Sequence, residues 1–139
     1  LAFAAAAHTT LVVTTPEPTA ITDAYAVIKT AHRQRPDLDA RLIVNQAGDP
    51  DEGLHVYTRV ANVCRKFLRL DLPYAGCLLR DPIVSQSVRL RRPFALDAKQ
   101  SPAAVALSAL AHRLDKHAAE PQAERTGLIK RMTARLVRG

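Results

Sequence analysis

The chain has 139 residues, with 20 Lys and Arg against 13 Asp and Glu, which gives a net charge of +7 at pH 7. This length fits one domain or part of one, and 47% hydrophobic residues with only 4% aromatic residues are typical of an Ala-, Leu- and Val-rich α/β domain. No run reaches the roughly 20 apolar residues of a transmembrane helix, and Cys64 and Cys77 lack the spacing of a metal site.

The first half of the chain predicts alternating helices and strands. The opening LAFAAAAH lacks a basic stretch, so we interpret it as the tail of an Ala-rich helix in a truncated or excised segment rather than as a signal peptide. Apolar runs predict buried strands at residues 10–14 (TLVVT), 41–45 (RLIVN) and 74–79 (YAGCLL). Between them we expect one helix from an N-cap at Thr19 to just before Pro36, and another from about Gly53.

The second half predicts mainly helices. A short helix follows Asp81-Pro82, the segment PFALDAKQ is expected to be extended or irregular, and Ser101-Pro102 marks the start of a longer helix. Pro121 breaks the chain before a last helix from about Thr126. The alternation predicts an α/β fold, with a mostly parallel sheet covered by helices.

Polar residues follow each of the three predicted strands. They are Thr14 to Glu17, Asn45-Gln46, and Arg80-Asp81-Pro82. Because ligands of parallel sheets bind at the carboxyl ends of the strands, we expect these groups to share one site. The alternative is that they are turn residues, with Asp81 and Pro82 simply starting a helix.

The sequence carries no complete catalytic motif. Its five glycines cannot form a G-x-x-x-x-G-K-[ST] phosphate loop, and there is no GxGxxG, GxSxG or HExxH. His32 and His112 fall on predicted helices, where a structural role is more common than a catalytic one. From its residues alone, the chain holds parts of a binding site, no catalytic residue and no metal ligands.

Three stretches, VVTTPEPTAITDAYAVIK, LIVNQA and RDPIVSQSVRLRRPF, resemble the C-terminal half of MinD/ParA-type P-loop ATPases, in particular those that regulate flagellar number. The resemblance runs from about Leu1 to Leu114 and implies a P-loop-type sheet. It also implies ATP as cofactor and an ATP-dependent homodimer. The Walker A and B motifs, and the residues that hold Mg²⁺, would belong to an N-terminal half that this sequence does not contain.

The resemblance also implies roles for particular residues. The residue that would read the adenine edge is Asn45, and a loop that would wrap the base largely through its backbone comprises Arg80, Asp81 and Pro82. Family members usually have Pro where this chain has Leu79. The residues that would face the partner subunit are Pro16, Glu17 and Asp23. An alternative for Asn45 and Glu17 is that both are ordinary turn residues.

The C-terminus predicts a separate amphipathic helix at residues 126–139, after a polar linker at 117–125 and an ATPase-like segment at 1–116. Its apolar face comprises Leu128, Ile129, Met132 and Leu136, and its basic face includes Lys130, Arg131 and Arg135. An apolar face opposite a basic one is typical of a helix that lies on an anionic membrane. The resemblance implies the same, because family members carry a C-terminal amphipathic helix that targets the membrane. The alternative is a helix packed on its own domain.

These features predict part of a MinD-like regulatory ATPase that controls flagellar number or placement from the cytoplasmic face of the inner membrane, with a flagellar GTPase as one candidate partner. ATP hydrolysis is expected of a full-length chain only. One alternative is a nucleic-acid- or protein-binding module that uses basic patches such as Arg89, Arg91 and Arg92. Another is a truncated product without independent activity, whose exposed sheet edge would make it poorly soluble.

Overall fold

The computed structural model describes residues 7–119, which form a parallel sheet of three strands in the order β1-β2-β3. The predicted α/β class with covering helices is confirmed. In chain order the elements are β1 (Thr9–Thr14), α2 (Pro18–Gln34), β2 (Asp39–Ala47), α3 (Pro50–Leu68), β3 (Tyr74–Leu79), α4 (Pro82–Leu90), α5 (Phe94–Asp97) and α6 (Pro102–Ala119). The opening LAFAAA and the predicted helix at 126–139 lie outside the described residues.

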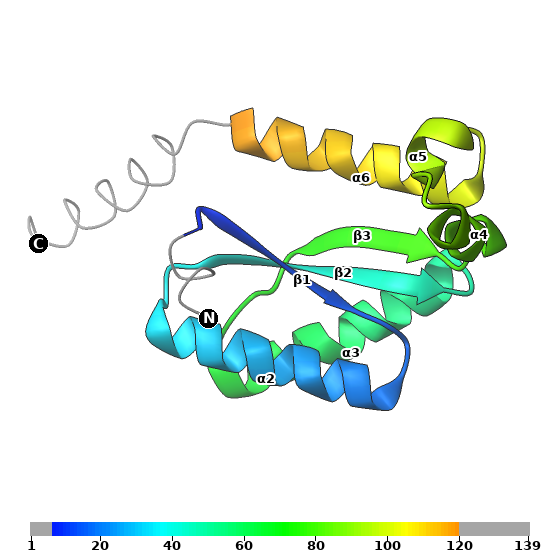
Figure 1. The fold of residues 1–139 in the computed structure, drawn as a ribbon. Helices are drawn as coiled ribbons and strands as arrows, with labels where there is room; N and C mark the ends of the chain where they lie inside the picture. The colour runs from blue at the N-terminus through cyan, green and yellow to red at the C-terminus, as the bar shows by residue number, and fades with distance from the viewer. Residues whose placement is uncertain (1–6, 120–139) are drawn as a thin grey trace, which may run out of the picture.

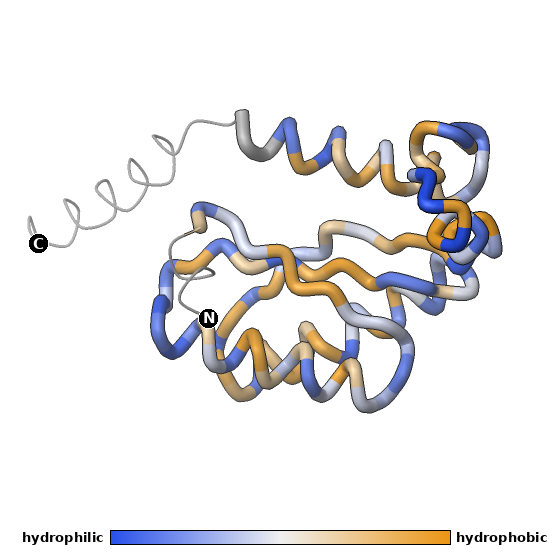
Figure 2. The backbone as a smooth tube through the Cα atoms, in the orientation of Figure 1, coloured by the Kyte–Doolittle hydropathy of each residue, from blue (hydrophilic) through white to orange (hydrophobic). Residues whose placement is uncertain are grey.

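Helices cover both faces of the sheet (Figure 1). Helices α2 and α3 connect successive parallel strands and pack side by side on one face, as crossovers of one hand require. That face holds the main core, where Ile28 and Val60 pack on Leu42 and Val44 of β2. The α6 helix lies on the opposite face, where Leu110 completes a smaller cluster. Figure 2 shows the apolar stretches of the strands running between these two layers.

Two helices begin earlier than the sequence predicts. The N-cap of α2 is Glu17, so the prediction of Thr19 is wrong, because Pro18 takes the first helical position that its fixed φ favours. The α3 helix starts at Pro50, three residues before Gly53. The carboxylate of Asp49 caps it by accepting from the Glu52 amide at 2.7 Å, and Glu52 reaches back to accept from the Gly48 amide at 2.6 Å.

The segment after α4 is also more ordered than predicted. Residues expected to be extended or irregular form the single turn α5, closed by a hydrogen bond of 2.8 Å from the Ala98 amide to the Phe94 carbonyl. An ion pair of 2.9 Å between Arg92 and Asp97 supports this turn. Ser101 caps α6 as predicted, because its hydroxyl accepts from the Ala104 amide at 3.2 Å. The helix runs on to Ala119, so residues 117–119 of the expected linker are helical.

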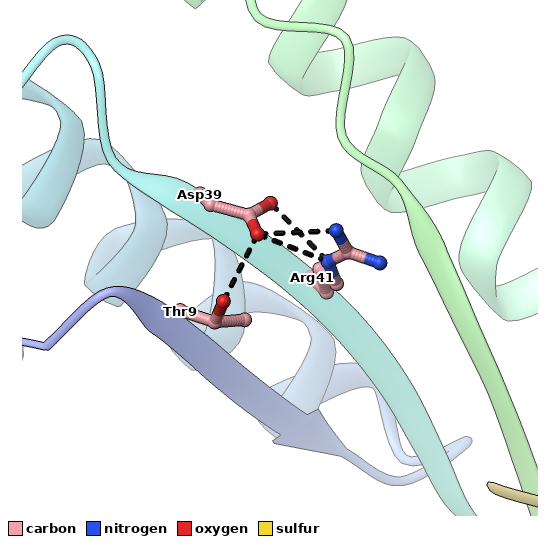
Figure 3. Close-up of polar contacts among 3 residues, drawn as sticks. All are labelled: Thr9, Asp39 and Arg41. Atoms are coloured by element: carbon pink, nitrogen blue, oxygen red, sulfur yellow. Dashed lines mark hydrogen bonds and ion pairs between the residues drawn. The ribbon is translucent and has the colours of Figure 1, made fainter. Parts of the chain in front are cut away.

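A polar cluster fixes the amino ends of β1 and β2 (Figure 3). The Asp39 carboxylate pairs with the Arg41 guanidinium at 3.1 Å and accepts a hydrogen bond of 3.0 Å from the Thr9 hydroxyl. Both charged side chains are only about 15% exposed, at 14% for Arg41 and 15% for Asp39. Thr9 stands opposite Asp39 in the strand pairing, so the cluster holds the register that sets where both strands end.

Strand β1 is less covered than its neighbours. It pairs with β2 along its full length, whereas α6 packs mainly on β3. On the α6 side of the sheet, Leu11 and Val13 are therefore 41% and 55% exposed. Within residues 7–119, β1 therefore has a strand neighbour on one side only and an exposed apolar face on the α6 side.

Candidate functional site

The parallel pairing brings the ends of the three strands to one edge of the sheet. Thr14 at the end of β1 stands beside Val44, and Ala47 at the end of β2 stands beside Leu79 of β3. A hydrogen bond of 2.7 Å from the Arg80 amide to the Ala47 carbonyl continues the pairing one step past β3. The three polar groups expected to share a site therefore start from adjacent positions along this edge.

The end of β2 is an irregular turn around Asn45 and Gln46. The strand register shifts between Val44 and Ala47, and Gln46 has a φ of 58°, a left-handed conformation that costs a residue other than glycine roughly 1–2 kcal/mol. The Asn45 side-chain oxygen accepts from the Gln46 amide at 3.0 Å, which orients the carboxamide. Asn45 keeps a second lone pair and two N–H donors with which to meet a ligand. Arg69 and Arg91 have similar φ values where α3 and α4 end, so what distinguishes Gln46 is its place at the end of a strand.

Asp81 uses both carboxylate oxygens inside the chain. One accepts from the Ile83 amide at 3.0 Å, which confirms the predicted N-cap of α4. The other accepts from the Ala103 amide in the first turn of α6 at 3.1 Å, a contact between residues 22 apart that the sequence did not reveal. Because both carboxylate oxygens of Asp81 already accept hydrogen bonds within the chain, a ligand at this loop would contact the backbone rather than the Asp81 side chain.

Arg80 and Pro82 complete the loop between β3 and α4. Arg80 is exposed, and its amide is held by β2. In the described part of the chain, no backbone or side-chain hydrogen bond ends on its carbonyl oxygen. Pro82 occupies the first position of α4, where a missing N–H costs nothing. An amide side chain and a backbone carbonyl at one edge suit the donors and acceptors of a nucleobase.

The turn after β1 holds an acidic side chain in place. The Thr15 hydroxyl donates to the Glu17 carboxylate at 3.1 Å, and the Glu17 carbonyl accepts from the Ile21 amide at 3.1 Å. Glu17 and Asp23 are both exposed, and Pro16 is half-buried. The structure thus places the exposed carboxylate of Glu17 at the N-cap of α2 and that of Asp23 in the second turn of this helix, close to the end of β1. The role of Thr15 in orienting Glu17 was not predicted from the sequence.

Cys64, Cys77 and the half-buried Tyr74 lie where α3 packs on the sheet. Burial raises the pKa of the Cys64 thiol to about 11, so this group stays protonated and inert near neutral pH. The pKa of Tyr74 is raised by burial and by the neighbouring Cys77 thiol, while Tyr57 stacks on its ring at 4.6 Å. Among residues 7–119, no group of three His, Cys, Asp or Glu side chains could hold a metal ion.

The described residues lack one element of a complete nucleotide site. The sheet edge offers amide and carbonyl groups to a base, but no glycine-rich phosphate loop is among them. Among residues 7–119, no helix combines the length and the apolar character that crossing a bilayer requires. The residues predicted to bind a membrane surface, at 126–139, lie outside the described part.

Comparison with known proteins gives two clear relatives. The chain is 34% identical over 115 residues to the antiactivator FleN of Pseudomonas aeruginosa, a match that covers 83% of this chain and 41% of FleN. It is 37% identical over 92 residues to the flagellum site-determining protein YlxH of Helicobacter pylori, covering 66% of this chain and 31% of YlxH. The chain thus spans less than half the length of either relative. No family model matches the chain.

Solved structures support the same relationship at the level of the fold. A MinD cell division protein of Aquifex aeolicus superposes with a TM-score of 0.59 at 23% identity, covering 81% of this chain and 45% of that protein. The MinC:MinD cell division complex from the same organism gives a TM-score of 0.56 at 26% identity, covering 79% of this chain and 43% of the matched chain. Both matches pair this sheet and its helices with part of a larger protein.

Proposed function

We propose that this chain forms the base-binding, partner-facing part of a regulatory ATPase. The premise is that the chain belongs to the MinD/ParA-type family, which its relatives show at moderate identity over most of its length. In this proposal the whole protein binds ATP, dimerises around it and controls the number or placement of flagella. The flagellar role is supported by the similarity to YlxH, a flagellum site-determining protein. Bound ATP with Mg²⁺ would supply the bond that is hydrolysed, while this chain would bind and orient the base.

The observation that carries the proposal is the strained Asn45–Gln46 turn beside the Arg80–Pro82 loop. The Arg80 amide bonds to Ala47, one residue past the left-handed Gln46, so the two loops are held against each other. The Asn45 carboxamide can both donate and accept, as the edge of adenine requires. The Arg80 carbonyl can accept from the exocyclic amine of adenine, whereas guanine presents an oxygen at that position.

Replacing Asn45 tests this proposal in the full-length protein that contains the chain. We expect Asn45→Ala to weaken ATP binding about tenfold, the loss of roughly one to two hydrogen bonds. Asn62→Ala is the matched control, because Asn62 is an exposed amide on α3. Equal ATP affinity of the Asn45→Ala variant and the wild-type protein in titration calorimetry would overturn the proposed base contact.

The proposed dimer contact uses the turn after β1. Pro16 stiffens this turn, Thr15 orients the Glu17 carboxylate, and Asp23 adds a second exposed charge to the same helix. In analytical ultracentrifugation with ATP, Glu17→Gln should reduce the dimer fraction, whereas Asp51→Asn, an exposed acid in the first turn of α3, should not. An unchanged dimer fraction in Glu17→Gln would remove Glu17 from the interface. The 139-residue chain alone should show no ATP turnover.

The segment at 126–139 is proposed to dock on the inner membrane from the cytoplasmic side. Its support is the pattern of apolar and basic residues in the sequence. Co-sedimentation with anionic vesicles should be lost when the chain ends at Glu120, and retained lipid binding by that shortened chain would refute the assignment. A flagellar GTPase remains a proposed partner, to be tested by co-purification with the full-length protein.

A second candidate function, nucleic-acid binding, has one specific observation in its favour. Arg89, Arg91 and Arg92 are all exposed around the end of α4, and Arg92 is paired with Asp97. Three exposed guanidinium groups can contact phosphates, and such binding falls steeply with salt. DNA binding that disappears in a triple Arg→Gln variant while vesicle binding persists would favour this function over membrane docking.

A further inference from the structure

A single carboxylate joins the starts of two helices at the candidate site. Asp81 accepts from Ile83 at the start of α4 and from Ala103 at the start of α6, at 3.0 and 3.1 Å. The N-terminus of a helix carries unpaired N–H groups and a partial positive charge, so each is stabilised by a nearby anion. Asp81 satisfies both starts at once, and it is half-buried between them.

The two helices depend on Asp81 to different degrees. The α6 helix has its own cap, because Ser101 accepts from Ala104. The α4 helix has no buried residue, so packing does little to hold it in place. The bond to Ala103 therefore serves mainly to fasten the loop and the start of α4 onto the better-packed α6.

The Arg80 peptide lies between two fixed points. On one side its amide bonds to Ala47 of β2 at 2.7 Å. On the other side, the next residue is bound through its carboxylate to α4 and α6, and its own carbonyl accepts from the Val84 amide at 3.1 Å. With both neighbours fixed, the direction of the Arg80 carbonyl is fixed as well.

We propose that Asp81 is a positioning residue that selects adenine, because its bond to Ala103 holds the Arg80 carbonyl where an exocyclic amine is accepted and a guanine oxygen is repelled. This inference rests on the proposed function, since it presumes that the base binds at this edge. It assigns Asp81 no contact with the nucleotide through its side chain. It also predicts that base binding changes the start of α6, which lies 22 residues away along the chain.

The Asp81→Asn variant separates the two bonds. Asparagine is as good an N-cap as aspartate, so it can still accept from Ile83 and start α4. Its amide nitrogen then faces the Ala103 N–H, donor against donor, and the bond to α6 is lost. The matched control is Ser101→Ala, which removes the other cap of α6 without touching the loop.

The measurement is the affinity of the full-length protein and its variants for ATP and for GTP, each with Mg²⁺. We expect Asp81→Asn to lower the preference for ATP over GTP about tenfold, while Ser101→Ala lowers thermal stability but leaves the preference unchanged. If Asn45→Ala weakens ATP binding and Asp81→Asn keeps the full preference, the positioning role is wrong and the base site stands. If neither variant changes nucleotide affinity, the proposed base site itself is wrong.

Hydrogen exchange gives a second readout that does not depend on how much stability Asp81→Asn loses. ATP should slow exchange of the Ala103 amide in the wild-type protein and in Ser101→Ala. The same ATP-dependent slowing should be absent in Asp81→Asn, because the link from the loop to α6 is missing. Equal slowing at Ala103 in Asp81→Asn and in the wild-type protein would overturn the inference.

Discussion

Replacing Gly53 by Ala sets two opposing effects against each other. Gly53 is buried on α3 and faces β3. In the interior of a helix, Ala is favoured over Gly by roughly 1 kcal/mol, so propensity alone predicts a more stable protein. A Cβ built at Gly53 would, however, lie 2.8 Å from the Cβ of Cys77 and 3.0 Å from its sulfur.

The steric effect should win. The Cβ of Cys77 is attached directly to the strand and cannot rotate away, so α3 and β3 must move apart by several tenths of an ångström. Overpacking of this kind costs roughly 1–3 kcal/mol. After subtracting the gain in helix propensity of about 1 kcal/mol, we expect a net loss of about 1 kcal/mol in the free energy of unfolding.

Denaturant unfolding followed by circular dichroism measures this value. The control Asn62→Ala, at an exposed position of the same helix, should stabilise the chain by a few tenths of a kcal/mol. Combining Gly53→Ala with Cys77→Gly should relieve the contact and give a coupling energy of roughly 1 kcal/mol or more. A gain of about 1 kcal/mol for Gly53→Ala alone, the propensity value, would refute the close approach of α3 to β3.

Two further predictions concern stability. The pKa of Cys64 is about 11 in the folded chain against 9.0 for an ordinary thiol. Between pH 9 and pH 11, the Cys64 thiol has lost its proton in the unfolded chain but keeps it in the folded chain. The stabilisation is therefore complete below pH 9 and falls as pH rises toward 11, by at most about 1.4 kcal/mol per pH unit. Unfolding curves at pH 8 and pH 10 should show this loss, and Cys64→Ala should reduce it; equal pH slopes in both proteins would contradict the assignment. Asp49→Ala should cost about 1 kcal/mol through the lost cap of α3, against a smaller effect for Asp51→Ala. Equal costs for the two variants in denaturant unfolding would mean that the cap bond contributes nothing.

Most of the fold follows from patterns that act over short distances along the chain. Apolar runs predicted the three strands, and the alternation with helices predicted their parallel arrangement. The α2 and α3 helices begin earlier than predicted, although local sequence signals mark both starts. Pro18 follows Glu17, and Asp49 stands three residues before Glu52, the spacing of reciprocal capping.

The site was predictable only in part. Parallel strands that end in polar residues bring the ends of those strands to one edge, and the pairing of Ala47 with Leu79 agrees with this expectation. The left-handed turn at Gln46 could not be foreseen, because glutamine has no preference for that conformation. The hydrogen bond from the Ala103 amide to Asp81 could not be predicted either, because it joins residues 22 apart through a backbone N–H that every residue except proline possesses.

The incomplete cover over β1 has a practical consequence. Leu11 and Val13 face solvent on a strand that has one neighbour among the described residues. A strand with unpaired N–H and C=O groups and an apolar face is a template for adding another strand. In solution by itself, the 139-residue chain should therefore form soluble aggregates as its concentration rises. The substitution Val13→Lys should raise the concentration at which these aggregates appear. A charged residue that interrupts an aggregation-prone strand in this way would keep the chain monomeric for measurements of its unfolding.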